Sequence, residues 1–243
     1  MLKPTFILLI ATALSTSSLA QADSLAAANT QQNEYLNVYR RSLQYSDLYS
    51  AGYALTLYLM NGGASHYKDT LALVYYQSGN YRGAFKMATE INQANPKNVT
   101  ALTLLADITG RSGDTKASLE WYEKLCGVSP EPYNYYQLAT RQFLLERVAE
   151  CKASLNKAIA DTAKSRADKV ALEVAQGNSE TVPVVAAAYN MLGALAYRAN
   201  QLAEAKKYYE LAIKEYPGFI IARNNLEGLK KPVQAAKPPA KKS

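Results

Sequence analysis

Apolar residues along most of the chain recur every three to four positions, in stretches that come in pairs. Leu202, Ala205, Tyr209 and Ala212 show the spacing clearly. This period places them on one face of an α-helix, with polar residues on the opposite face. The two stretches of a pair are separated by a glycine followed by asparagine or aspartate. The glycine is typical of a helix end, and the asparagine or aspartate caps the start of the next helix. The pattern therefore predicts a series of amphipathic helix hairpins.

The hairpins repeat at a fixed interval. A leucine–alanine pair, a glycine and a proline recur thirty-four residues apart, and related positions return in the last third of the chain; between them lies a weaker copy. The matching residues are Leu71-Ala72, Gly79 and Pro96; Leu105-Ala106, Gly113, Tyr122 and Pro130; Leu192-Gly193, Tyr209 and Pro217; and, in the weaker copy, Leu138-Ala139, Leu155 and Ala158.

These units resemble the tetratricopeptide repeat family, whose 34-residue units are helix hairpins. The resemblance extends over about residues 32–230. It implies an all-α fold, a right-handed α-solenoid of about five hairpins, and a C-terminal capping helix beginning near Phe219. Two helices of a hairpin approach closely only where a side chain is short, and such sites are Ala72, Ala84, Ala106, Gly193 and Ala205.

The ends of the chain differ from the repeats. Residues 1–22 combine Lys3, a short apolar run and Ala20-Gln21-Ala22, which predicts a secretory signal peptide and a periplasmic or secreted protein. The solenoid domain is expected over 23–231. An insertion near 164–182 is expected to extend a helix through Val170–Val174 and then form a loop. Residues 232–243 are rich in Pro, Ala and Lys, which predicts a basic disordered tail.

Charge does not indicate a nucleic-acid-binding protein. The formal net charge is +7, but without Lys3 and the five lysines of the last fourteen residues, 21 basic residues stand against 20 acidic ones. No later stretch is apolar enough to span a membrane. Only the tail is a candidate polycation, for contact with anionic components of the cell envelope.

The sequence offers little for catalysis, and no cofactor or metal site is expected. His66 is the only imidazole, and no metalloprotease, phosphate-loop or paired-cysteine motif is present. Cys151 aligns with the close-packing alanines, whereas Cys126 lies eight positions further along the equivalent helix of the preceding unit, an axial offset of about 12 Å. Free thiols are favoured, and a disulfide between Cys126 and Cys151 stays the alternative.

The 19 tyrosines divide by repeat register into two sets. Tyr75, Tyr122 and Tyr209 fall at packing positions. A second set falls on the opposite face of the first helix of each hairpin, the concave face on which, as the resemblance implies, partners bind. That predicted groove consists of Tyr76, Gln77, Asp107, Arg111, Tyr133, Tyr136, Thr140, Phe143, Asn190, Tyr197 and Arg198.

Tyrosine and arginine in a groove are typical of protein recognition. The functional hypothesis is thus a non-catalytic interaction scaffold of the cell envelope that binds a peptide or partner segment. The alternative is a component of an envelope assembly or secretion complex, tethered by its tail to anionic lipid or glycan. The lysine and asparagine sites with which related domains clamp an acidic carboxyl terminus hold Asp69, Leu73 and Thr103 here, which disfavours a chaperone adaptor.

Export makes a direct prediction. Because a signal peptidase cleaves after small residues, protein recovered from its native cell should begin at Asp23 or Gln21. Amino-terminal sequencing of the purified protein measures this, and Met1 retained in a membrane fraction would contradict it.

Overall fold

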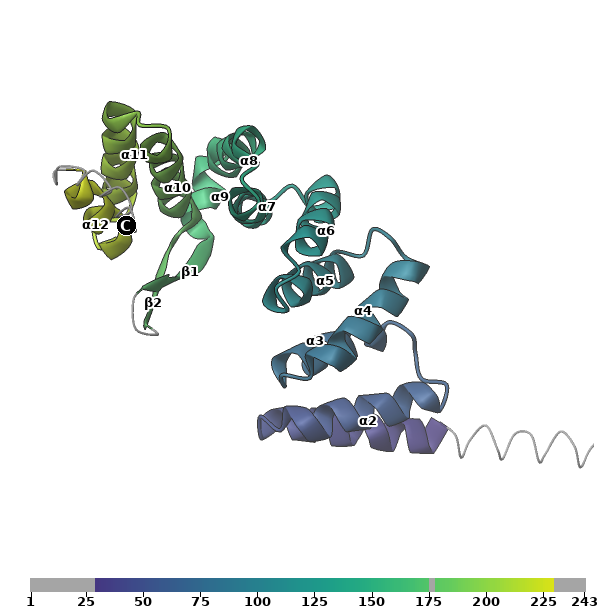
Figure 1. Cartoon of the computed structure of the whole chain (residues 1–243). Helices are drawn as coiled ribbons and strands as arrows, with labels where there is room; N and C mark the ends of the chain where they lie inside the picture. Colours follow the sequence, from purple (N-terminus) through teal and green to yellow (C-terminus); the bar gives the residue numbers. More distant parts are fainter. Residues whose placement is uncertain (1–28, 175–177, 230–243) are drawn as a thin grey trace, which may run out of the picture. The chain divides into compact units, whose positions relative to one another are not determined.

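The computed structural model describes residues 29–174 and 178–229 (Figure 1). The predicted signal peptide, residues 1–22, and the predicted tail, residues 232–243, lie outside the described residues. The chain divides into two units, one ending at Ile108 and the other beginning at Thr109, and each is taken by itself.

The first unit consists of consecutive antiparallel helices. A helix over residues 29–44 is followed by α2 (Leu48–Met60), α3 (Tyr67–Gln77), α4 (Tyr81–Ala94) and most of α5 (Val99–Arg111). The turn between α3 and α4 contains a glycine with φ of +80°, a conformation that glycine adopts without steric cost. The asparagine after it accepts a hydrogen bond of 3.0 Å from a backbone N–H in the first turn of α4, as the sequence predicts.

The core of the first unit lies where α2 and α3 face one another and the preceding helix. Leu36, Ala51, Leu55, Leu71 and Val74 form one buried cluster. Ala51 is fully buried, so it lets the neighbouring helices approach closely.

The second unit continues the pattern and ends in a capping helix. The first and second helices of its hairpins alternate along the chain, and the last hairpin is followed by α12. The elements are α6 (Thr115–Val128), α7 (Pro132–Leu144), α8 (Val148–Ala160), α9 (Thr162–Ala167), β1 (Lys169–Val174), β2 (Asn178–Pro183), α10 (Val184–Arg198), α11 (Leu202–Glu215) and α12 (Ile220–Gly228). The predicted helix-hairpin fold with a terminal helix is therefore confirmed.

The predicted close-packing sites are fully buried. Ala84, Ala106, Cys151 and Ala205 have no exposed surface. A Cβ atom added to Gly193 would lie 2.5 Å from the ring of the tyrosine at the packing position of α11. That separation is shorter than van der Waals contact, so the ring is packed directly on the glycine backbone.

The insertion differs from the expectation. A helix through Val170–Val174 was predicted, but these residues form part of β1, which pairs antiparallel with β2. Val170 lies opposite Val182, and both are buried. The physical reason is the alternation of Val170, Leu172 and Val174 with more polar neighbours, a two-residue period that favours a strand over a helix.

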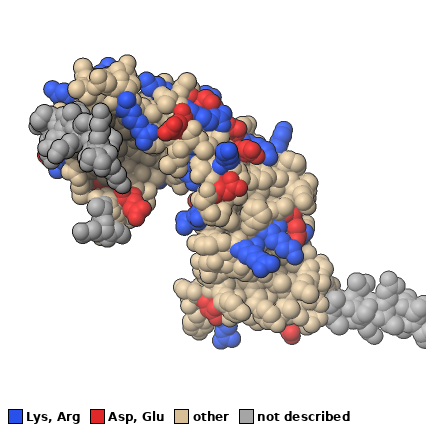
Figure 2. Space-filling model, viewed as in Figure 1, with Lys and Arg blue, Asp and Glu red and all other residues tan. Residues whose placement is uncertain are grey.

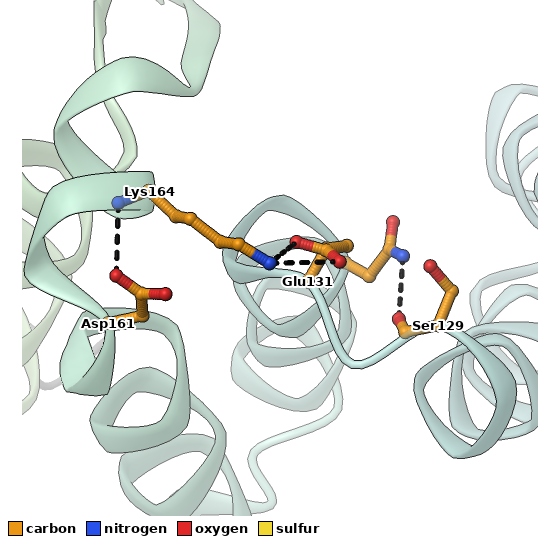
Figure 3. A network of polar contacts seen from close by, with 5 residues as sticks. Ser129, Glu131, Asp161 and Lys164 are labelled. Carbon is orange, nitrogen blue, oxygen red and sulfur yellow. Dashed lines mark hydrogen bonds and ion pairs between the residues drawn. The ribbon is translucent and has the colours of Figure 1, made fainter.

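Side-chain contacts fasten the insertion to the hairpins on both sides. Lys164 in α9 forms an ion pair of 3.1 Å with Glu131 before α7 (Figure 3). Arg166 makes two hydrogen bonds of 2.7 and 2.9 Å to Glu215, the last residue of α11. Glu180 in β2 accepts hydrogen bonds from the backbone N–H of Ile220 and so caps α12.

Both cysteines are buried free thiols in the structure. Cys151 donates a hydrogen bond of 3.2 Å from its Sγ to the backbone carbonyl of Ala139. Burial raises the pKa of each thiol to about 12, which keeps both in the unreactive protonated form near neutral pH. Separately, no helix in the described ranges combines the length and apolar character needed to cross a membrane.

The Arg166–Glu215 pair predicts a pH dependence of stability. The hydrogen bond from Arg166 lowers the pKa of Glu215. The pair therefore stabilises the fold above the ordinary carboxylate pKa, and this contribution is lost as pH falls through the lowered value. In urea denaturation, Arg166→Gln should be less stable than the natural protein at pH 7, with the difference shrinking toward pH 3.

Lys206→Gln is the matched control, because the Lys206–Glu210 pair is exposed and separated by 3.7 Å. It should change stability little at any pH. A difference for Arg166→Gln that stays constant from pH 7 to pH 3 would show that the ion pair is not its cause.

Candidate binding surface

The residues predicted to form a groove all lie on the first helices of the hairpins, and they divide between the two units. The first unit holds Tyr76 and Gln77 on α3 and Asp107 on α5. The second unit holds Arg111 on α5; Tyr133, Tyr136, Thr140 and Phe143 on α7; and Asn190, Tyr197 and Arg198 on α10.

In the first unit, the predicted residues of α3 and α5 come together. The hydroxyl of Tyr76 donates a short hydrogen bond to a carboxylate oxygen of Asp107. The ring of Tyr76 also meets Tyr81 edge to face, with centroids 5.4 Å apart. Gln77 is exposed beside them. Tyr76 is thus held in one orientation by a hydrogen bond and a ring contact, which leaves Gln77 the most accessible of the three.

In the second unit, Arg198 joins α10 to α7. Its guanidinium lies over the ring of Phe143, 4.1 Å from the ring centroid. This distance is within the range of a cation–π interaction. Tyr197, next to Arg198, is 45% exposed, and Tyr133 is 38% exposed. The last turn of α10 therefore carries an accessible tyrosine followed in sequence by an arginine whose guanidinium is oriented by a ring contact.

Tyr136 is not on an exposed groove, and its predicted place there is wrong. Its side chain is only 4% exposed and belongs to the same buried cluster as Val184, Ala187 and Ala188 at the start of α10. Burial raises the pKa of Tyr136 well above its usual range. The short alanine side chains in α10 leave room for a large ring, so the tyrosine fills the space between helices.

Two further predicted residues are engaged within the protein. Asn190 accepts a hydrogen bond of 2.9 Å from the side-chain amide of Asn225 in α12. Thr140 donates a hydrogen bond of 3.0 Å to the backbone carbonyl of Tyr136. Both are half-buried, so their first role is to fix local structure.

The packing tyrosines lie as predicted. Tyr122 and Tyr209 are buried. Tyr75 is half-buried, and its hydroxyl lies 2.7 Å from the Oγ1 of Thr56 on α2. That contact links the second helix of one hairpin to the first helix of the next.

Sequence reasoning missed an aromatic surface on α2. Tyr49 and Tyr53 are 85% and 64% exposed, and they line a pocket of about 450 Å³ together with Tyr75 and Asn80. The signal is present in the sequence as two tyrosines four residues apart, which share one face of a helix. They lie on the second helix of a hairpin, whereas the prediction considered first helices.

Charge on the face seen in Figure 2 is of both signs, and the described residues offer no metal-binding arrangement. In the view of Figure 2, basic and acidic side chains are interspersed, with uncharged areas between them. Among the described residues, no group of three or more His, Cys, Asp and Glu side chains is placed to hold a metal ion. His66 lies against Tyr67, with ring centroids 4.5 Å apart.

Two segments of the chain match family models described as tetratricopeptide repeat, at residues 70–132 and 186–219. A curated relative, the uncharacterized protein ycf37 of Porphyra purpurea, is 45% identical over 47 residues. That match covers 19% of this chain and 27% of the relative, so the similarity spans about a quarter of the relative's length.

Solved structures share the fold at low sequence identity. A tetratricopeptide repeat protein from Parabacteroides merdae has a TM-score of 0.65 and 17% identity, covering 82% of this chain and 72% of that one. MamA from Desulfovibrio magneticus has a TM-score of 0.61 and 13% identity, covering 78% and 97%. YrrB, described as a TPR protein with an unusual peptide-binding site, has a TM-score of 0.60 and 14% identity, covering 79% and 90%.

The burial of Tyr136 predicts a structural role. Tyr136→Ala should lower the free energy of unfolding by about 3–5 kcal/mol, because it leaves a cavity the size of an aromatic ring. Tyr197→Ala, at an exposed position of the neighbouring first helix, should change it by less than about 0.5 kcal/mol. Chemical denaturation of both variants measures this, and equal stabilities would contradict the placement of Tyr136 in the core.

Proposed function

The chain is a tetratricopeptide repeat protein, and we propose that it is a non-catalytic scaffold that binds a peptide or partner segment through the first helices of its hairpins. The observation that carries the proposal is the contact of Arg198 with Phe143 in the second unit, together with the exposure of Tyr197, the residue before Arg198 on α10. An exposed tyrosine offers a large contact area with a polar hydroxyl, and the adjacent guanidinium offers directed hydrogen bonds.

This geometry suits recognition. Phe143 holds the guanidinium of Arg198 at 4.1 Å, which reduces the conformational freedom that the arginine would lose on binding. Tyrosine and arginine are the residue types that most often dominate binding energy at protein interfaces. The guanidinium of Arg198 is therefore already oriented before a partner binds.

The similar structures support the same class of function. YrrB is described as having an unusual peptide-binding site, and it shares the fold of this chain. The proposal assigns peptide binding to this chain as well, on residues of its own sequence. It does not carry over the location of the YrrB site.

The proposed location is the cell envelope. It rests on the signal-peptide pattern of residues 1–22 and on the lysines of residues 232–243. The alternative function, an assembly component tethered to anionic lipid or glycan, rests on those lysines alone. Removing residues 232–243 separates the two, because a tethered component would lose envelope association and a groove-binding scaffold would keep its partner.

A partner recovered from envelope extract with the natural protein provides the ligand for a quantitative test. Tyr197→Ala should weaken its affinity by about 1–2 kcal/mol or more, because the variant removes exposed contact area. Isothermal titration calorimetry measures the change, and thermal unfolding of the same sample shows that the fold is intact.

Tyr53→Ala is the matched control, an exposed tyrosine on a second helix. It should leave affinity unchanged. If Tyr53→Ala weakens binding while Tyr197→Ala does not, the partner uses the α2 surface and the proposed site is wrong.

A further inference from the structure

The strand hairpin of the insertion projects from the helices of the second unit (Figure 1), and the proposed function does not use it. Its register places Ala171 of β1 opposite Thr181 of β2. Just before the ladder, the backbone N–H of Val184 donates a hydrogen bond of 3.0 Å to the carbonyl of Asp168. Hydrogen-bonded pairs alternate along an antiparallel ladder, so the even-numbered residues of β1 bond to β2. The backbone groups of its odd-numbered residues therefore point away from β2.

The outward-pointing residues of β1 form an open edge. They are Lys169, Ala171 and Glu173, and all three side chains are exposed. Among the described residues, no hydrogen bond from outside the hairpin reaches the backbone of Ala171 or Glu173. Val170 lies on one face of the strand, in the buried cluster that includes the start of α10, so the helices cover a face of the hairpin. Unpaired N–H and C=O groups along an exposed edge can bond to another strand.

The edge of β2 is less suited to pairing. Its outward-pointing residues are Ser179, Thr181 and Pro183, by the same alternation. Pro183 has no N–H to donate. Glu180, between them, already accepts hydrogen bonds from the backbone N–H of Ile220 in α12. An added strand would therefore find a complete set of donors and acceptors only on β1.

The two charges on β1 have no ion-pair partner among the described residues. Lys169 lies opposite Pro183, and Glu173 lies opposite Ser179, so the neighbours across the hairpin are uncharged. The Nζ of Lys169 donates a hydrogen bond of 3.0 Å to the backbone carbonyl of Arg166. Lys169 and Glu173 are too far apart to pair with each other, because four residues along a strand span about 13 Å.

A second copy of β1 supplies both missing charges. In an antiparallel pairing about a two-fold axis at Ala171, Lys169 of each copy lies opposite Glu173 of the other. Val170 then lies opposite Leu172 of the other copy, on the apolar side of the strand. The hydrogen-bonded pairs in this register are formed by the residues whose backbone groups point outward. A register centred on Lys169 or Glu173 would place like charges opposite each other, which is destabilising. Hydrogen bonding and charge thus favour the same alignment.

We propose that the protein forms a symmetric dimer in which β1 pairs with β1 of a second copy, antiparallel and centred on Ala171. The two hairpins together form a four-stranded sheet. The interface is isologous, because each copy contributes the same strand. Contact between two short strands buries little surface, so the dimer is weak and reversible.

Sedimentation equilibrium of the purified natural protein tests the dimer without requiring the partner of the proposed function. Protein concentrations from about 1 μM to about 1 mM cover the range expected for a weak contact. The average mass should rise from that of the monomer toward that of the dimer as concentration increases. A monomer mass that persists at the highest concentration would overturn the proposal.

Matched proline variants assign the contact to one edge. Ala171→Pro removes the outward N–H at the centre of the interface and leaves the bonds to β2 in place, so it should weaken dimerisation about tenfold or more. Thr181→Pro makes the same change directly opposite, on the edge of β2. It should dimerise as the natural protein does. Equal dimer dissociation constants for the two variants would overturn the assignment to β1.

Charge reversal tests the register, and it decides the matter if a proline variant does not fold. Lys169→Glu and Glu173→Lys each place like charges opposite each other in a symmetric dimer, so each alone should dimerise about tenfold or more weakly. An equimolar mixture of the two variants restores both opposite-charge pairs and should form a heterodimer as stable as the natural dimer. A mixture that associates no better than either variant alone would overturn the proposal.

Discussion

The fold depends on the close approach of the two helices within each hairpin, which requires a side chain of minimal size at one position of the second helix. Ala51, Ala84, Cys151 and Ala205 occupy that position, and all are fully buried. Close approach within a hairpin leaves an apolar face that only the next hairpin can cover. The requirement for a small residue therefore recurs in successive hairpins, and this recurrence explains why the repeat is visible in the sequence.

The insertion shows what happens where the repeat spacing is interrupted. Between α8 and α10 the chain places α9, β1 and β2, and Val170 and Val182 enter the same buried cluster as Cys151 and Leu155. The hairpin of strands thus supplies apolar contacts that the regular spacing no longer provides. Arg166 then fixes the segment to the end of α11. An interruption of the repeat is tolerated here because its own residues join the core.

The limits of the sequence reasoning follow from the same physics. Helix hairpins, caps and small positions were predicted correctly because each depends on local spacing. The strand at Val170–Val174 was missed because a short apolar run fits a helix or a strand, and pairing with a distant segment decides between them. Tyr136 was misplaced because its exposure depends on the alanines of α10. The unpartnered Oε1 of Gln142 could not be predicted, since a missing partner is a property of the assembled structure.

These cases suggest where a repeat protein of this kind can vary its chemistry. Positions that set the distance between helices admit only small residues, so they carry no recognition. The position shared by Tyr75 and Gln142 differs in residue type between repeats and borders a pocket in each. A tyrosine there reaches Thr56 and links α2 to α3, whereas the Oε1 of the glutamine is buried without a hydrogen-bond partner among the described residues. The contact between neighbouring hairpins at this position therefore differs from repeat to repeat, whereas the small residues that set the distance between helices recur.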